Sequence, residues 1–161
     1  MGMVEQLWVL AGVAYAMLLG GVVGFERELK NRPAGFRTHM LVAGASALLI
    51  GIGQLLMIDP SHTGREMVHV DPLRLVEAVV AGVSFIGAGT IFAHRGGAAI
   101  AGITTAASLL MVAVIGVAVG LRYLLLATAA TGLTLLVLTL LNVVERRLLA
   151  RARESDQSKD S

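Results

Sequence analysis

The chain has 161 residues, of which 56% are hydrophobic and 15% charged, and its mean hydropathy is +0.79. Soluble globular domains are less apolar and carry about 25% charged residues, so a small soluble domain is excluded. An aromatic content of only 4% argues against a membrane β-barrel, which has girdles of aromatic residues. Because cysteine is absent, no disulfide can form. The composition therefore predicts an all-α, polytopic membrane helix bundle.

The few charged residues divide the chain into five long apolar runs, each close to the ~20 residues that cross a bilayer. The third run begins after Asp71 and Pro72, which suit an N-cap and a first helical position. Residues 1–148 form the predicted membrane domain, and residues 149–161 form a polar cytoplasmic tail that we expect to be disordered. We predict five transmembrane helices, at about 6–25, 38–58, 74–93, 98–120 and 123–144.

Lysine and arginine are unequally divided between the two ends of the predicted bundle. If the N-terminus lies outside, the inner side holds 10 of the 13 basic residues and the outer side only Arg65, Arg74 and Arg122. This bias predicts an N-out, C-in orientation in a cytoplasmic membrane. The formal charge of +2 and the pI near 9.5 are then explained by topology, and the expected partner is the lipid bilayer rather than nucleic acid.

Small residues recur at four-residue spacing along the first predicted helix, at Gly12, Ala16, Gly20 and Gly24. This small-residue stripe lies on one helical face, where it lets a second backbone approach closely. The neighbour is either another helix of the same chain or a second copy in a homodimer. The sequence leaves both interpretations open.

A dense charged segment, residues 25–39, follows this stripe directly. As a connector, it obeys the positive-inside rule, with Glu26 and Lys30 paired at i,i+4. As a site, it places ionisable groups so close to the membrane that they need partners or a watery cavity. The candidate residues for a site are Glu26, Arg27, Arg37 and Thr38.

Glycine and threonine interrupt the middle of the bundle. Gly87 and Gly89 weaken a helix by roughly 1 kcal/mol each relative to Ala, so together with Thr90 they indicate either a helix break that frees backbone groups for an ion or a close packing face. Farther along the chain, Thr104 and Thr105 precede Ser108, and these hydroxyls could line a polar seam.

Acidic and imidazole side chains gather in the predicted outer loop and at its end, where Asp71 and Glu77 mark an outer mouth. The loop also carries Asp59, His62, Glu66 and His69, but their spacing is not diagnostic of a metal site, and we expect a solvated loop. No nucleophile constellation or dinucleotide motif occurs. We therefore predict a protein that is not an enzyme and that needs no cofactor.

Four blocks resemble the MgtC/SapB family of membrane proteins. They are GGVVGFERE at 20–28, PAGFRTHMLV at 33–42, GVSFIGAGTI at 82–91 and GITTAASL at 102–109. Their order and spacing make the resemblance specific, and it extends over roughly residues 5–145. Leu110 departs from the pattern because a Trp is common there, and Glu77 stands where an amide is more usual.

The resemblance implies a bacterial or archaeal inner-membrane protein with five spans. It further implies a role in growth at low magnesium and, in pathogens, in survival inside host cells, with some members restraining the F-type ATP synthase. Longer members carry a cytoplasmic regulatory domain after the fifth span, so this chain is expected to be a short form.

Two functions follow as hypotheses. The first is a membrane regulator that contacts a protein partner. The second is a small transporter or channel for Mg²⁺ or another ion, acting as a homo-oligomer because five helices leave little room for a pathway.

Overall fold

The computed structural model describes residues 2–58, 71–92 and 102–157, with side chains described as far as residue 140. Within these ranges the chain forms five α-helices and no strand. They are α1 (Met3–Leu29), α2 (Phe36–Ile58), α4 (Pro72–Phe92), α5 (Ile103–Gly120) and α6 (Leu124–Gln157). The predicted all-α helix bundle is thereby confirmed.

Four of the described helices, α1, α2, α4 and α5, are long and apolar enough to cross a membrane. The apolar part of α6, as far as its side chains are described, is the shorter segment Leu124–Leu140. The outer loop at 59–70 and the turn at 93–101 lie outside the described residues, so the candidate loop ligands have no described position.

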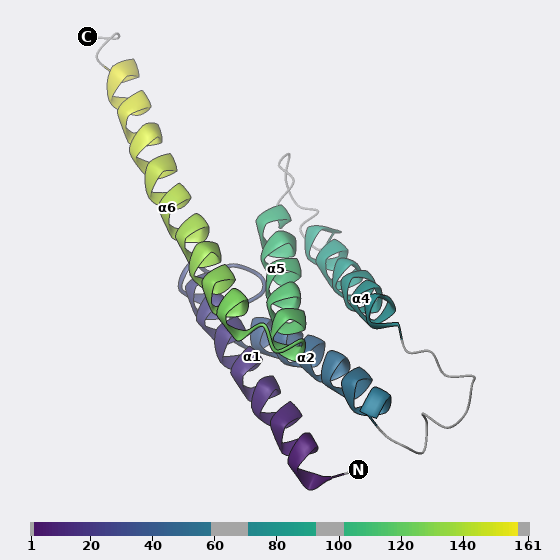
Figure 1. The fold of residues 1–161 in the computed structure, drawn as a ribbon. Helices are drawn as coiled ribbons and strands as arrows, with labels where there is room; N and C mark the ends of the chain where they lie inside the picture. Colours follow the sequence, from purple (N-terminus) through teal and green to yellow (C-terminus); the bar gives the residue numbers. More distant parts are fainter. Residues whose placement is uncertain (1, 59–70, 93–101, 158–161) are drawn as a thin grey trace.

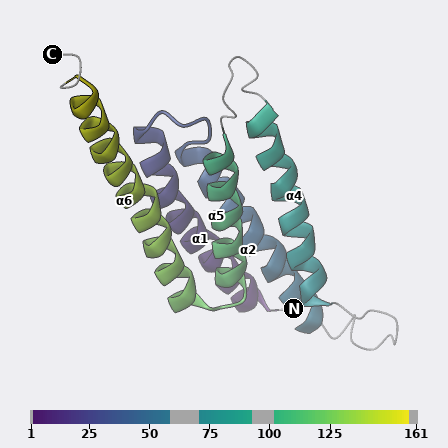
Figure 2. The ribbon, with the colours of Figure 1, turned by 90° about the horizontal axis from the view of Figure 1, so that it is seen from above.

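Helix α5 is the central element of the bundle, because it packs against each of the other four described helices. Helices α4 and α6 flank it on opposite sides, and α1 and α2 lie behind it (Figures 1 and 2). The N-terminal end of α1 and the C-terminal end of α6 lie at opposite ends of the bundle (Figure 1).

Small side chains bring α1, α2 and α5 together in a tightly packed apolar core. Ala16, Ala43 and Ala113 are completely buried. A Cβ added at Gly120 of α5 would lie 2.7 Å from the Cβ of Ile50 in α2, which is closer than real side chains approach. Such contacts replace the hydrophobic driving force that is missing between helices in lipid.

Helix α4 begins as the sequence predicts and then continues without a break. Asp71 Oδ1 accepts a hydrogen bond of 2.9 Å from the backbone N–H of Leu73, and the helix starts at Pro72. The helix break considered at Gly87 and Gly89 does not occur. Gly87 instead faces α5, where an added Cβ would lie 3.2 Å from the Cβ of Ala106, whereas Gly89 has nothing within 4 Å of that position.

Two predicted boundaries differ from the structure. Helix α5 starts at Ile103 rather than near 98, because Gly102 adopts a left-handed φ of 97° that is incompatible with helical geometry. Helix α6 continues to Gln157, so residues 149–157 are helical although we expected a disordered tail. The sequence there includes Leu149, Ala150 and Arg151, which are strong helix formers.

Candidate functional site

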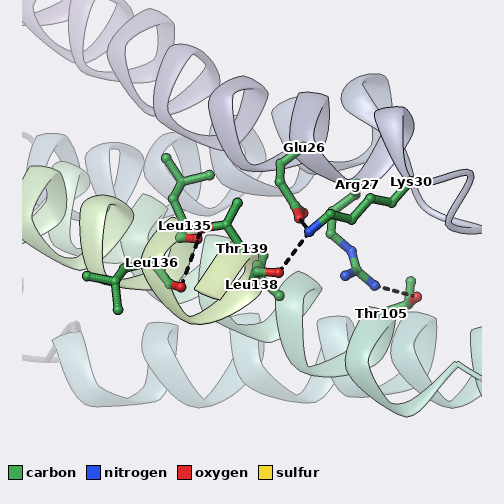
Figure 3. Close-up of polar contacts among 8 residues, drawn as sticks. All are labelled: Glu26, Arg27, Lys30, Thr105, Leu135, Leu136, Leu138 and Thr139. Atoms are coloured by element: carbon green, nitrogen blue, oxygen red, sulfur yellow. Dashed lines mark hydrogen bonds and ion pairs between the residues drawn. The ribbon is translucent and has the colours of Figure 1, made fainter. Parts of the chain in front are cut away.

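Charged side chains are buried at the C-terminal end of α1. Glu26 and Lys30 lie one helical turn apart and form an ion pair, as their i,i+4 spacing predicts. The Lys30 Nζ also donates a hydrogen bond of 2.9 Å to the carbonyl oxygen of Leu138 in α6 (Figure 3). Glu26 is 8% exposed. One carboxylate and one amine thus connect α1 to α6.

Arg27 points from the same turn of α1 toward α5. Its side chain is 1% exposed, and its Nη2 donates a hydrogen bond of 3.2 Å to the hydroxyl oxygen of Thr105 in the first turn of α5 (Figure 3). Because Glu26 and Arg27 are adjacent in sequence, they face different neighbours. The helix therefore directs one charge toward α6 and the next toward α5.

His39 brings α2 into the same cluster and is completely buried. Its Nδ1 lies 2.9 Å from the carbonyl oxygen of Gly35, which can only accept, so Nδ1 donates. Its Nε2 lies 3.0 Å from Ser108 Oγ, and that hydroxyl also lies within 2.8 Å of the carbonyl oxygen of Thr105. We call the residues Glu26, Arg27, Lys30, His39, Thr105 and Ser108 the buried polar cluster.

One polar atom of the buried polar cluster has no partner among the described residues, the Nε of Arg27. The Glu26 carboxylate has Lys30 as its ion-pair partner. A buried polar group without a partner costs about 1–3 kcal/mol, and more when it is charged. The bundle therefore maintains an expensive arrangement at this end, which is typical of functional ionisable groups in membrane helices.

The small-residue stripe of α1 lets α2 approach this cluster. A Cβ added at Gly20 would lie 2.5 Å from the carbonyl oxygen of His39, and one at Gly24 would lie 2.9 Å from the His39 Cβ. Farther along the stripe, Ala16 is completely buried and Gly12 approaches Val119 of α5. In the structure the stripe thus packs against helices of the same chain.

Several residues singled out from the sequence lie apart from this cluster. Arg37 and Thr104 are exposed and Thr38 is half-buried, although Thr38 is next to His39 and Thr104 is next to Thr105 in sequence. Asp71 and Glu77 are exposed near the start of α4, a different helix. The half-buried Thr90 donates its hydroxyl to the carbonyl oxygen of Gly87 (2.7 Å) within α4.

The structure adds His39, Ser108 and Lys30 to the candidate residues. The sequence already indicated two of them by their spacing. Ser108 lies three residues after Thr105 and therefore on the same helical face, and Lys30 lies four residues after Glu26. For His39 the sequence offered only its place within the charged segment.

Metal-binding capacity is low in the part of the chain that the structure describes. No group of three or more His, Asp or Glu side chains there could hold a metal ion. The two cations of the buried polar cluster outnumber its single carboxylate, which disfavours a cation at that point.

A bundle of long apolar helices with charged residues buried at one end defines a multi-pass helical membrane protein. Residues 13–147 match the MgtC family. This match extends over more than half of the chain, and the chain belongs to the MgtC family.

Three relatives illustrate this membership. The "Putative magnesium transporter YhiD" of Escherichia coli (strain K12) is 36% identical over 139 residues, covering 83% of this chain and 60% of the relative. "Protein MgtC" of Brucella abortus (strain 2308) is 38% identical over 121 residues, covering 75% and 46%. "Protein SapB" of Bacillus subtilis (strain 168) is 36% identical over 114 residues, covering 70% and 47%.

The chain thus spans at most 60% of the length of each of these three relatives. No solved structure matches this chain.

Proposed function

We propose that this chain is a non-enzymatic regulator in the cytoplasmic membrane that helps the cell adapt to low magnesium. It acts by contacting a membrane complex, for which the F-type ATP synthase is the candidate that family resemblance suggests. The N-terminus lies outside and the C-terminus inside.

The observation that carries this proposal is the closely packed, largely apolar interior of the bundle. An ion path through one chain would need Glu26, Arg37, Thr90 and Thr104 to line a common channel. Arg37 and Thr104 are exposed instead, and Thr90 bonds within its own helix. The described core between the two ends of the bundle is closely packed and largely apolar, through Ala43, Ala47, Ile50, Val112, Ala113 and Ile115. Its buried Ser46 donates its hydroxyl to the carbonyl oxygen of Val42 within α2. Conduction needs polar groups or water along the whole path.

The orientation is supported by the positive-inside bias, with 10 of the 13 basic residues at one end. It places the buried polar cluster at the cytoplasmic end of the bundle, since the cluster lies at the C-terminal end of α1. A regulator that responds to the cell interior needs its sensitive residues on that side.

Growth in limiting magnesium tests the proposal. A bacterial strain deleted for its own MgtC-family gene should grow with the wild-type chain and fail with Glu26→Gln, which removes the only carboxylate of the cluster. Arg37→Gln is the matched control, because Arg37 belongs to the same charged segment but is exposed. Both variants must insert into the membrane at wild-type levels. Equal growth of the Glu26→Gln strain would contradict the assignment of the cluster.

A second function is favoured by one specific finding, the similarity to the "Putative magnesium transporter YhiD" of Escherichia coli. Transport by this chain would require a path between copies in a homo-oligomer. Because Gly20 and Gly24 pack within the chain, such an oligomer would need an interface other than the small-residue stripe. Ion flux into proteoliposomes separates the two functions.

A further inference from the structure

Helix α2 is capped at its N-terminus by a side chain of the preceding helix. The backbone N–H of Phe36, the first residue of α2, donates a hydrogen bond of 2.8 Å to Glu28 Oε2. The N–H groups of a first helical turn have no partner within their own helix, and Gly35, which precedes α2, has no side chain that could accept from them. The Glu28 carboxylate takes this role, at a position where the helix dipole also favours a negative charge.

The position of Glu28 depends on the way in which α1 ends. The N–H of Asn31 donates to the carbonyl oxygen of Glu28 (3.0 Å), and the N–H of Arg32 donates to that of Arg27 (3.1 Å). Asn31 adopts a left-handed φ of 51°. These two bonds form a Schellman C-cap, in which a left-handed residue directly after the helix reverses the chain. The reversal brings the start of α2 back to the last turn of α1, which contains Glu28.

Two glycines permit the close approach of this turn to α1. A Cβ added at Gly35 would lie 2.7 Å from Glu28 Oε2, which is closer than real side chains approach. A Cβ added at Gly24 of α1 would lie 2.8 Å from the Cα of Phe36 and 3.0 Å from the carbonyl oxygen of Gly35. The Gly35–Phe36 peptide unit is therefore held between the backbone of α1 and the Glu28 carboxylate.

The same peptide unit holds the ring of His39. Its N–H, from Phe36, donates to Glu28, and its carbonyl oxygen, from Gly35, accepts from His39 Nδ1 at 2.9 Å. A peptide unit is planar and rigid, so an interaction that orients its N–H also orients its carbonyl group. The other ring nitrogen of His39, Nε2, lies 3.0 Å from Ser108 Oγ. A continuous chain of hydrogen bonds thus runs from Glu28 through one peptide unit and one imidazole ring to α5.

We propose that Glu28 is a positioning residue of the buried polar cluster, which orients His39 toward Ser108 through the Gly35–Phe36 peptide unit. Glu28 is exposed, whereas His39 and Ser108 are buried. A carboxylate at the surface of the bundle therefore determines the geometry of a contact inside it. The importance of this role for the cell rests on the proposed regulatory function, but the role itself can be measured without that function.

The Nδ1–H signal of His39 tests the proposal by nuclear magnetic resonance of the full-length protein, labelled with ¹⁵N-histidine in detergent micelles. The signal is identified by its loss in His39→Gln. Glu28→Ala should shift it and accelerate its exchange with water roughly tenfold, the factor that corresponds to the loss of one helix cap. Glu28→Gln should preserve it, because the amide oxygen also accepts a hydrogen bond. An unchanged signal in Glu28→Ala would overturn the proposal.

Two control variants separate positioning from a general loss of stability. Gly120→Ala places a methyl group 2.7 Å from the Cβ of Ile50 at the other end of α5, so it should lower the thermal stability without changing the His39 signal. Arg37→Gln removes an exposed charge next to Phe36 and should leave the signal as in the wild type. If Gly120→Ala changes the signal as much as Glu28→Ala does, Glu28 acts only through stability and the positioning role is wrong.

Growth in limiting magnesium relates this role to the proposed function. If the buried polar cluster is the regulatory site, Glu28→Ala should reduce growth and Glu28→Gln should restore it. A changed His39 signal with wild-type growth would contradict the proposed function and support the positioning role. An unchanged signal would contradict the positioning role alone.

Discussion

The buried polar cluster depends on a small number of hydrogen bonds that cross between helices. His39 is held on both ring nitrogens, by the carbonyl oxygen of Gly35 and by the hydroxyl of Ser108. The second of these bonds connects α2 to α5 at a point where no water-exposed alternative exists, since His39 and Ser108 are both buried. Removing the hydroxyl leaves a ring nitrogen unpaired in an apolar setting.

Replacing Ser108 with alanine should therefore lower the free energy of unfolding by about 1–3 kcal/mol. Ser84→Ala is the control, because Ser84 is exposed on α4, and its effect should stay within about 0.5 kcal/mol. Unfolding by denaturant in detergent micelles, followed by circular dichroism, measures both values. Equal stability of the two variants would show that the His39–Ser108 hydrogen bond contributes nothing.

The sequence predicted which segments contribute residues to the buried polar cluster, but not which of their side chains face inward. Glu26 and Arg27 were predicted from the dense charged segment and Thr105 from the group of hydroxyl residues that precedes Ser108, and all three lie in the cluster. Arg37 and Thr104 were predicted from the same two segments, yet they are exposed. Neighbouring residues of a helix point about 100° apart, so only the packing of α1, α2 and α5 decides which one faces inward.

Among the helices, close contact is made at glycines rather than at large apolar side chains. An added Cβ at Gly20 would lie 2.8 Å from the Cβ of Ala43, and one at Gly116 would lie 2.9 Å from the Cβ of Ser46. Other glycines do not lie at a close contact between helices. Nothing lies within 4 Å of the corresponding position at Gly89 or Gly132.

Replacing glycine with alanine should therefore change the free energy of unfolding in opposite directions at Gly20 and Gly89. Gly20→Ala should destabilise the protein by about 1–3 kcal/mol, because the new methyl group overlaps α2. Gly89→Ala should stabilise it by up to about 1 kcal/mol, because alanine favours a helix and the space is open. Thermal unfolding of the two variants in the same detergent checks the signs. A stabilising Gly20→Ala would contradict the close packing of α1 on α2.

The helical elements could be predicted from charge-free runs because a membrane helix needs about 20 apolar residues. The N-terminal boundary of α4 was also predictable, since Asp71 and Pro72 are start signals. The N-terminal boundary of α5 could not be predicted, because it depends on the left-handed φ of Gly102. A Cβ at Gly102 would lie 2.6 Å from the carbonyl oxygen of Thr90, a tertiary contact that no local pattern reveals.

The two ends of the whole molecule differ in their side chains. The buried polar cluster lies at the C-terminal end of α1. The opposite end contains Trp8, whose ring lies 5.2 Å from the guanidinium carbon of Arg122. Such cation–π contacts suit the membrane interface. The N-out, C-in orientation that the positive-inside bias predicts would place these two different ends in opposite leaflets.

The absence of cysteine allows this orientation to be measured by labelling single introduced thiols. In intact cells made permeable only at the outer membrane, Gly2→Cys should react with an impermeant maleimide. Arg32→Cys, in the exposed connection between α1 and α2, should react only after the inner membrane is opened. The reverse pattern would place the N-terminus inside.

Ion flux into proteoliposomes that contain the purified full-length chain is the most direct test of whether this protein regulates rather than transports. Because the described core is closely packed and largely apolar, the uptake of Mg²⁺ and of monovalent cations should equal that of protein-free vesicles, at protein densities that permit oligomers. Saturable Mg²⁺ uptake that exceeds the vesicle background and is lost in Glu26→Gln would contradict the regulatory function and establish a transport path through the buried polar cluster.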